Sequence, residues 1–346
     1  MNAFIAVLLA QDGLTTGAIY ALLAIALVML FSVTRVVFVP QGEIVSFAAL
    51  TLASLQAGRV PGTAWLLVAG GLLVAAIDLV AYLRGGRERT RLVSAALYGL
   101  GPLVAVGAAR LVLGPEAPMT AQIAVTLVLV APLGPVLYRL AFAPLANASV
   151  LVLLMTAVAV HFVLVGLGLI AFGAEGARTP PLFPDNLFVG GVILSQQALF
   201  VVAVAAALMV AMGLFFGRTL QGKALRATAM NRTGARIVGI PTASAGVLAF
   251  LLAGLIGTVS GVLIAPITTI YYDTGFLIGL KGFMAAIVGG MGSYALAVAG
   301  ALAIGGLETV ASFYASAYKE AIVFALIIPI LVWRSLTTRH VEEDEE

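Results

Sequence analysis

The sequence predicts an all-α integral membrane protein, a polytopic bundle of about ten transmembrane helices (nine to eleven), some of them short or broken. Two observations carry this prediction. Of the 346 residues, 62% are hydrophobic and 10% are charged, whereas a soluble domain carries about 25% charged residues because its surface faces water. The apolar residues also gather in long runs, and roughly 20 of them suffice to cross a bilayer as a helix. Most of the surface must therefore face lipid or other apolar helices.

The predicted spans follow the apolar runs in chain order. The first residues lack the basic start and the cleavage site of a secretory signal, so we expect them to be retained. Three runs (44–58, 279–291 and 320–333) are short for a bilayer, and we expect tilted, re-entrant or broken helices there. Residues 1–341 are predicted to form one transmembrane domain, followed by an acidic, solvated tail at 342–346. The runs lie at 14–33, 44–58, 64–83, 92–113, 119–137, 149–172, 192–216, 244–265, 279–291, 295–316 and 320–333.

The basic residues predict the orientation of the bundle, because Lys and Arg gather in cytoplasmic loops of membrane proteins. Counting the runs in order places every basic loop on one side, which we predict to be cytoplasmic. The opposite loops, around Pro115–Met119 and Glu175–Asn186, are poor in cations, and the side of Met1 stays open. The basic loops contain Arg84, Arg87, Arg89 and Arg91, then Arg139, then Arg218, Lys223, Arg226, Arg232 and Arg236, and finally Arg334 and Arg339.

Small residues recur at four-residue spacing in three of the predicted spans. In lipid, such faces let helix backbones approach closely. We therefore predict ordinary helix packing at Gly13/Gly17, Gly213/Gly217 and Ala253/Gly257/Gly261.

Residues 217–243 form the most informative loop, because they are basic and yet have the pattern of a helix. Gly239 followed by Pro241 is a typical helix stop. A solvated connector needs no apolar stripe, so we predict a short amphipathic helix outside the bilayer, docked either on another protein or on anionic lipid. The stripe consists of Ala224, Leu225, Ala227, Ala235 and Ile237.

The same loop resembles the coupling loop of permeases in the branched-chain amino acid (Liv-type) ABC transporter family. Gly222, Ala224, Arg226, Ala227, Ala235, Gly239 and Ile240 match its pattern, whereas Asn231 stands where the family usually has an acidic residue. The resemblance implies the ABC importer permease fold. It also implies that the ATPase is contacted through Gly222, Lys223, Ala224, Arg226, Ala227, Asn231, Arg232, Ala235 and Gly239.

The resemblance extends over roughly residues 13–58 and 138–333. It includes the stretches Gly13–Leu22, Gly279–Phe283, Gly289–Ser293 and Gly305–Glu308. In 35–43, Arg35, Gly42 and Glu43 match, while Phe38 and Gln41 replace the usual Asn and His. Residues 64–113 supply two apolar runs where the family pattern leaves no room for them, so we predict an extra helix pair there.

Ionisable and polar residues within membrane runs are candidates for the translocation pathway. We assign Gln41, Glu43, Tyr271, Lys281 and Glu308 to it. Glu43 follows Pro40 and Gly42, and three interpretations stay open: a site at an interrupted helix, a helix cap, or an ion pair with Arg35. Lys281 is expected to pair with Asp273 or Glu308 more readily than with a substrate carboxylate, and Glu308 to face protein or a cavity.

Two further ionisable residues are expected to have structural roles. Asp78 lies near the cytoplasmic end of its run, and we expect it to reach the basic loop at 84–91 by snorkelling. His161 is central in its run, and we expect a hydrogen-bonded packing histidine rather than a ligand contact.

The sequence also excludes several classes of protein. It contains no cysteine and two histidines without metal-ligand spacing, so no metal site is predicted. No catalytic set at membrane depth is evident, which argues against an intramembrane enzyme, and no partnership with nucleic acid is expected. The chain lacks the motif GxxxxGK[ST] and cannot itself bind ATP in a P-loop. No cofactor is expected beyond ATP bound by partner subunits.

The resemblance implies a transport subunit of the bacterial inner membrane that imports amino acids or related small carboxylate or amide solutes. Its partners would be a second permease subunit, homologous or identical, two ATP-binding cassette ATPase subunits and a periplasmic substrate-binding protein. ATP binding would close the ATPase pair, and the loop around Gly222–Gly239 would pass this motion to the helices. Two alternatives stay open: a sugar-type ABC permease and an ATP-independent secondary transporter.

Overall fold

The computed structural model describes residues 3–84, 89–189, 192–325, 328–330, 332 and 336 of the chain. Three further helical turns, η1 (Tyr138–Phe142, a π-helix), η2 (Ala143–Leu145) and η3 (Ser316–Tyr318), connect longer helices. Two strands, β1 (Asn186–Val189) and β2 (Val192–Ser195), form an antiparallel pair in which Asn186 faces Ser195. The α-helices are α1 (Ala3–Thr34), α2 (Gln41–Gln56), α3 (Gly62–Leu83), α4 (Arg89–Leu111), α5 (Met119–Val130), α6 (Leu133–Leu137), α7 (Val150–Phe172), α8 (Gln196–Arg218), α9 (Leu220–Met230), α10 (Arg232–Ile237), α11 (Thr242–Ile264), α12 (Thr274–Val288), α13 (Tyr294–Ala315) and α14 (Lys319–Ala325).

The predicted polytopic all-α membrane fold is confirmed. In the described residues, eight helical segments are long and apolar enough to cross a membrane. The shorter α2 and α12 correspond to the short apolar runs at 44–58 and 279–291, and at 1.5 Å per residue neither reaches the roughly 30 Å of a hydrocarbon core. Of the run at 320–333, the structure gives α14. Arg87, Arg334, Arg339 and the acidic tail at 342–346 lie outside the described residues.

Serine residues set the starts of several long helices. Ser149, Ser195 and Ser293 precede α7, α8 and α13, and each hydroxyl accepts a hydrogen bond from the backbone N–H three residues later. Such N-caps satisfy a donor that the helix itself leaves unpaired. The cap at Ser195 also shows why the predicted run at 192–216 is helical only from Gln196: the preceding residues pair as strand β2.

Close glycine contacts hold the centre of the bundle together. Gly13 and Gly17 of α1 lie against Gly306 and Leu302 of α13, and Gly257 and Gly261 of α11 lie against α2. These two predicted packing faces are therefore confirmed. The third is wrong: among the described residues no atom lies within 4 Å of a side chain built at Gly213 or Gly217, because that face of α8 has no neighbouring helix.

The short helices α2 and α12 meet at their first turns. A side chain at Gly42 would collide with the backbone of Gly275, and one at Gly279 would collide with Gly42. Glycine is thus required for this crossing, which explains two glycines of the stretches that resemble the family. Before α2 the chain leaves α1 through Arg35, whose φ of 58° is in the left-handed region. The first membrane helix is therefore followed by a break and then by a short helix that starts inside the bundle.

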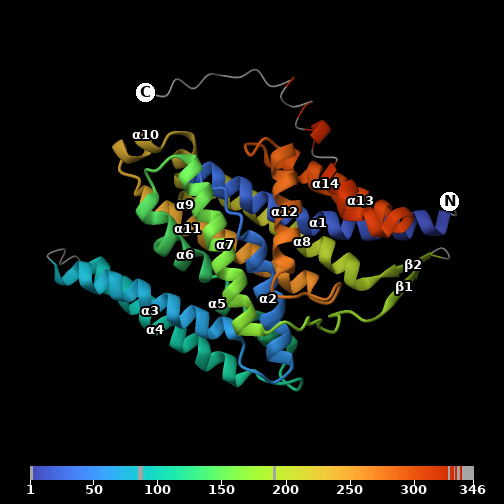
Figure 1. The fold of residues 1–346 in the computed structure, drawn as a ribbon, viewed down its shortest axis with the longest axis horizontal. Helices are drawn as coiled ribbons and strands as arrows, with labels where there is room; N and C mark the ends of the chain where they lie inside the picture. The colour runs from blue at the N-terminus through green and yellow to red at the C-terminus, as the bar shows by residue number, and fades with distance from the viewer. Residues whose placement is uncertain are drawn as a thin grey trace.

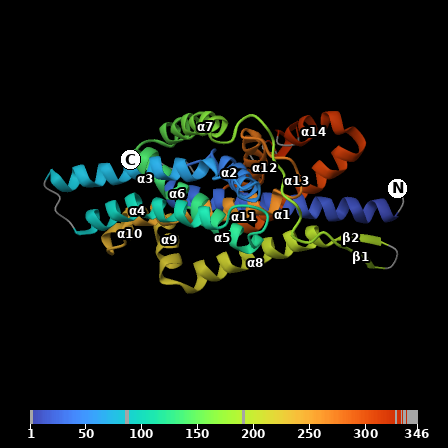
Figure 2. The ribbon, with the colours of Figure 1, turned by 90° about the horizontal axis from the view of Figure 1, so that it is seen from below.

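The two ends of the molecule are formed by different elements (Figures 1 and 2). At one end, which we call the basic end, lie α9, α10 and the connected ends of α3 and α4. At the other, the hairpin end, lie β1, β2 and the N-terminal start of α1. A hydrogen bond joins neighbouring segments at each end. Arg232 donates to the carbonyl of Ala146 (2.8 Å) at the basic end, and Gln11 donates to the carbonyl of Ser195 (3.4 Å) at the hairpin end. The start of α1 therefore lies opposite the basic loops, a point the sequence leaves open.

Helices α3 and α4 form the hairpin that the sequence predicts as an extra pair. Asp78 of α3 is buried and does not reach the basic loop that follows it, contrary to expectation. Instead both carboxylate oxygens accept from Arg139 of η1 (2.6 and 2.8 Å), which also donates to Ser94 of α4. The reason is proximity, since the end of α3 runs beside η1, and the guanidinium fork matches a carboxylate.

Candidate functional site

The predicted basic loop folds as two short helices joined at Asn231. Asn231 has an extended backbone (φ −153°), and its side-chain oxygen accepts from the N–H of Gly234 (2.7 Å). The single amphipathic helix of the prediction is therefore wrong in this detail, because Asn231 ends α9 and caps α10. Gly239, with φ 86°, ends α10, as the sequence predicts. Asn231 thus has a structural use that needs no acidic side chain.

The two helices, which with their flanks we call the basic segment (residues 219–240), sit firmly on the bundle. Thr219 caps α9 by accepting from the N–H of Gly222 (2.9 Å), and a side chain at Gly222 would collide with the backbone of Phe215 and Phe216. Leu225 and Ala235 are buried, and α9 packs against α1, α8 and α11. A displacement of α9 would therefore change its contacts with three long helices.

The outer face of the basic segment is both apolar and basic. Leu220, Met230, Ile237 and Val238 are each at least 74% exposed. Ile237 therefore does not belong to the buried stripe, in contrast to the prediction, because the break at Asn231 turns α10 away from the face of α9. Lys223 and Arg226 are exposed on α9, and Ala224 and Ala227 are half-buried between the two faces. Exposed apolar side chains framed by cations are typical of a surface that another protein covers.

A buried ionic cluster surrounds Lys281 of α12. Its ammonium lies 2.6 Å from Glu308 of α13 and 3.1 Å from Glu320 of α14. Tyr20 of α1 donates to the other oxygen of Glu308 (2.7 Å), and its ring lies 5.8 Å from the ammonium. We call these four residues the Lys281 cluster. Of the two partners predicted for Lys281, Glu308 is the one observed, and Asp273 is not in contact.

A second buried pair joins α2 to α7. Oε1 of Glu43 lies 2.6 Å from Nδ1 of His161, and Glu43 is fully buried. The imidazole ring also packs against the ring of Phe276 (4.7 Å between centroids). His161 is thus the hydrogen-bonded packing residue that was predicted, whereas the predicted alternative of a Glu43–Arg35 pair is wrong, because Arg35 is exposed. The other oxygen of Glu43 has no hydrogen-bond partner among the described residues.

The two departures from the family pattern beside Glu43 have structural uses. Gln41 is buried and donates to the carbonyl of Ala253 in α11 (2.9 Å). Phe38 belongs to a buried aromatic group with Tyr138, Phe142 and Phe250, whose neighbouring rings lie 4.9–5.9 Å apart. The chain break before α2 is therefore packed against η1 and α11 rather than open.

The five residues predicted for the translocation pathway fall into separate places. Gln41 and Glu43 lie on α2, and Lys281 and Glu308 form one cluster. Tyr271 stands apart in the loop before α12, where its ring lies beside Gly176. Within the described residues, no hydrogen bond joins the α2 residues to the Lys281 cluster.

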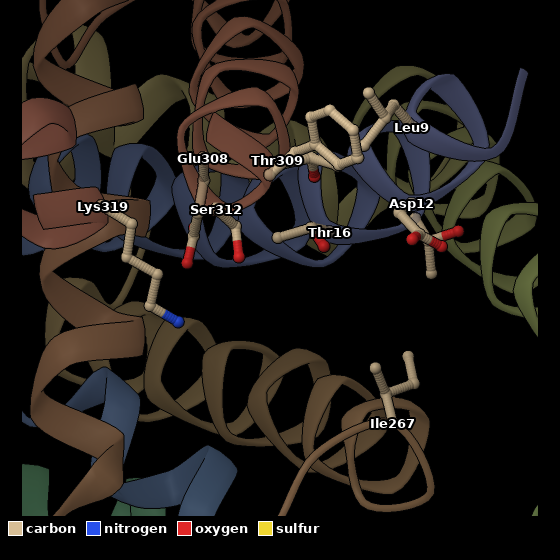
Figure 3. A pocket seen from close by; sticks show the side chains of 10 residues that line it. Leu9, Asp12, Thr16, Ile267, Glu308, Thr309, Ser312 and Lys319 are labelled. Carbon is tan, nitrogen blue, oxygen red and sulfur yellow. The ribbon is translucent and has the colours of Figure 1, made fainter. Parts of the chain in front are cut away.

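A cavity of about 540 Å³ opens at the hairpin end between α1, α13, the start of α14 and the loop at 265–273. Figure 3 shows Glu308 and Ser312 of α13 pointing into it, with Lys319 next to Glu308 in this view and Ile267 below. Asp12 and Thr16 of α1 line its other side. We call this space the hairpin-end cavity. Because Glu308 belongs both to its wall and to the Lys281 cluster, the buried cluster is reached from this end.

Sequence reasoning missed Tyr20, Glu320, Asp12 and Lys319. Tyr20 lies in a stretch that resembles the family, but nothing in its spacing indicates a partner 288 residues away. Lys319 and Glu320 begin the last apolar run, and an ionisable pair at the start of a span was a usable signal. Asp12 precedes the first run by two residues, where an acidic side chain is unremarkable.

Comparisons with known proteins identify the family. The family model described as "Branched-chain amino acid transport system / permease component" matches residues 92–331. The permease protein BraD of the high-affinity branched-chain amino acid transport system of Pseudomonas aeruginosa is 25% identical over 93% of this chain and 92% of its own length. LivH, the corresponding permease protein of Escherichia coli (strain K12), is 26% identical over 93% and 91%. The L-arabinose transport system permease protein AraH of Escherichia coli (strain K12) matches 35% of this chain and 40% of its own at 26% identity. No solved structure matches the chain.

Proposed function

We propose, because the chain belongs to the family of branched-chain amino acid transport system permease components, that it is the membrane-spanning subunit of an ATP-driven ABC importer. Its cargo would be amino acids or related small carboxylate or amide solutes. It would reside in the bacterial inner membrane and work with a second permease subunit, homologous or identical. Two ATP-binding cassette ATPase subunits and a periplasmic substrate-binding protein complete the assembly.

The outer face of the basic segment is the observation that carries this proposal. Exposed apolar residues and cations lie side by side on two short helices at the end of the molecule that the Lys/Arg bias marks as cytoplasmic. Leu220 and Met230 are the first and last residues of α9, and Lys223 and Arg226 lie between them. Such a surface fits a protein partner better than water. A chain without a P-loop motif needs an ATPase partner if ATP drives it.

The packing of α9 supports a mechanism for coupling. When the ATPase pair closes, α9 would move as a rigid helix, since Leu225 is buried and Gly222 lies in contact with the end of α8. Its contacts with α1 and α11 would pass the displacement to the helices that hold α2. This is a two-state change biased from one end, as alternating access requires.

The two buried ionic groups are suited to the pathway that this motion would open. Both short helices, α2 and α12, carry one of them, and transporter sites favour interrupted helices whose first turns lie inside the bundle. Glu43 lies in the first turn of α2, and Lys281 at the midpoint of α12. Ionisable side chains within membrane spans are rare and are functional candidates even where they are paired.

A sugar-type cargo has less support. The arabinose permease AraH matches about a third of the chain, whereas the branched-chain amino acid permeases match nearly all of it. We therefore favour an amino acid type of solute.

ATP hydrolysis by the purified complex tests the proposal. The double variant Gly222→Ala with Arg226→Ala should abolish the stimulation of ATP hydrolysis by the loaded binding protein, because the first change displaces α9 and the second removes a cation from its outer face. The matched control is Gly217→Ala with Arg84→Ala. Gly217 faces open space among the described residues, and Arg84 is an exposed cation of the basic end outside the segment.

The control variant should keep the stimulation, and both variants should insert in the membrane in equal amounts. Equal stimulation in the two variants would refute the role of the basic segment. Failure of any ATPase subunit to co-purify with the chain would refute the importer function itself.

A further inference from the structure

An apolar cavity of about 510 Å³ lies between α7 on one side and α2, α3, α6 and η1 on the other. Its wall on α7 runs from Thr156 to Leu167, which leaves about a turn and a half of this helix beyond the cavity at either end. The cavity therefore lies near the middle of a membrane span and not at its water-facing ends. Ile44 and Phe47 of α2, both fully buried, form its floor.

The wall of this cavity offers water almost nothing to bind. Among the described residues that line it, Thr156 has the only polar side chain, and its hydroxyl donates to the carbonyl of Val152 (2.8 Å). A buried water needs at least two polar partners, so an apolar cavity of this kind stays dry. Left empty, it would deprive the surrounding side chains of van der Waals contacts, and protein interiors contain few such voids. We therefore expect an apolar occupant.

The cavity opens toward the outside of the bundle between α3 and α7. Leu73 of α3 and Val163 of α7 both line it, and they are 58% and 59% exposed. Figure 2 shows α7 at the edge of the bundle. A side chain at Gly62 of α3 would collide with Ala171 of α7, so the two helices touch there, and the cavity lies on the basic-end side of this contact. At this depth of a membrane the surroundings are lipid hydrocarbon.

The dimensions of the cavity distinguish a lipid chain from a helix of another subunit. The wall from Thr156 to Leu167 covers about 17 Å of α7 at 1.5 Å per residue. The volume divided by this length gives a mean cross-section of about 30 Å². A helix is about 10–12 Å across with its side chains and needs roughly 80–110 Å². A single file of methylene groups is much thinner, so the space fits a hydrocarbon chain and excludes a helix.

We propose that this cavity binds one acyl chain of a phospholipid, which enters from the bilayer between α3 and α7. The chain lies against Ile44 and Phe47 and completes the packing of α7 on the bundle. The bilayer is as apolar as the cavity, so the chain is held by van der Waals contact with the wall and not by removal from water. The site adds a lipid to the structure of the protein, whatever solute the protein carries.

Helix α2 permits a direct test, because none of its residues is exposed. A phospholipid with a diazirine in the middle of one acyl chain is added to the protein and its partner subunits in lipid nanodiscs. After illumination, the labelled residues are identified by mass spectrometry. Lipid-facing residues such as Phe162 of α7, which is 68% exposed, should be labelled in any case. The proposed site predicts additional label on α2 at Ile44 and Phe47, which the chain reaches through the cavity.

A variant that narrows the opening provides the second measurement. Ala69 of α3 and Ala159 of α7 both line the cavity and are exposed, so Ala69→Phe with Ala159→Phe fills its mouth. The matched control is Ala203→Phe with Ala206→Phe, which adds the same two rings to an exposed face of α8 outside the wall. The first variant should lose the label on α2 and the control should keep it. Label on Phe162 in both variants shows that each is folded in the bilayer.

Absence of label on α2 in the unsubstituted chain, with Phe162 labelled, would overturn the proposal, because the cavity would then be closed to lipid or covered by another subunit. Label on α2 that persists in Ala69→Phe with Ala159→Phe would also overturn it, since the lipid chain would then reach α2 by another path. Loss of label in the control variant as well would overturn it too, because the loss would not depend on the cavity. All three outcomes leave the transport function untouched.

Discussion

The two buried ionic groups of the bundle differ in their access to the surface. The pair of Glu43 and His161 is enclosed, with Glu43 fully buried and the ring of His161 covered by Phe276. In the Lys281 cluster, Lys281 and Tyr20 are also buried, but Glu308 borders the hairpin-end cavity and the side chain of Glu320 is 38% exposed. One group therefore connects two helices, whereas the other also contributes to the wall of the hairpin-end cavity.

The two groups hold different sets of helices together. The enclosed pair ties the first turn of α2 to α7, close to the glycine crossing with α12. The open cluster connects α1, α12, α13 and α14 through a single ammonium group and its partners. Substitutions should therefore affect folding at both places, but only those in the open cluster should change the properties of the cavity.

The largest effect is expected from Lys281→Met. It leaves the carboxylate of Glu308 largely buried without its cation, and breaking a buried ion pair in this way costs about 3–5 kcal/mol. The temperature at which the purified protein loses its folded, monodisperse form should fall accordingly. Adding Glu308→Gln should recover part of the loss, since the uncompensated charge is then removed. A single variant as stable as the parent would contradict the importance of the cluster.

His161→Phe should have the next largest effect. The ring packing against Phe276 is kept, but Oε1 of the buried Glu43 loses its partner, so that neither oxygen of this carboxyl group is hydrogen-bonded to another described side chain, which costs about 1–3 kcal/mol. The same thermal measurement detects the loss, and Glu43→Gln in the same chain should reduce it. A thiol placed in the wall of the hairpin-end cavity by Ser312→Cys reports on that cavity through the rate at which a charged maleimide labels it. If His161→Phe changes this rate, the two ionic groups are not as separate as their contacts indicate.

Tyr20→Phe should be milder than either. Glu308 loses one hydrogen bond and keeps its pair with Lys281, so the expected cost is about 1 kcal/mol. Because Glu308 and Ser312 both line the hairpin-end cavity, the rate at which a charged maleimide labels the thiol of Ser312→Cys should also change. An unchanged rate together with unchanged stability would show that the hydrogen bond contributes little.

Glu320→Gln should have the smallest effect. Its side chain is 38% exposed, and ion pairs with this much solvent contact contribute about 0–1 kcal/mol. A thermal shift as large as that of Lys281→Met would contradict the view that Glu308 is the main partner of the ammonium group.

Hydropathy and the need to pair charges made much of this arrangement predictable. Long apolar runs gave the helices, the lysine and arginine bias gave the basic end, and the cost of a lone charge in lipid led from Lys281 to Glu308. The same reasoning correctly predicted that Asp78 needs a cation, but it assigned the cation to the loop at 84–91 instead of to Arg139. The nearest arginine in space, Arg139, is 61 residues away in the chain.

The features that escaped prediction depend on tertiary contacts or on single backbone choices. Nothing local indicates that Glu43 meets an imidazole 118 residues away. The split of the basic segment depends on Asn231 capping a helix with its own side chain, which competes with continuation of the first helix. The glycines of α8 have the same spacing as those of α1, yet only α1 finds a partner helix in the described structure. The hairpin-end cavity is formed by three stretches distant in the sequence, at 9–16, at Ile267 and at 308–319.

We propose that ATP hydrolysis at the basic end drives solute uptake through this chain. Uptake of radiolabelled L-leucine can be measured in proteoliposomes that contain the purified complex, with binding protein outside and ATP inside. We expect accumulation of L-leucine that requires both the binding protein and ATP, and we expect the variant Gly222→Ala with Arg226→Ala to abolish it. Accumulation driven by a proton or sodium gradient in the absence of ATP would contradict it and would indicate a secondary transporter.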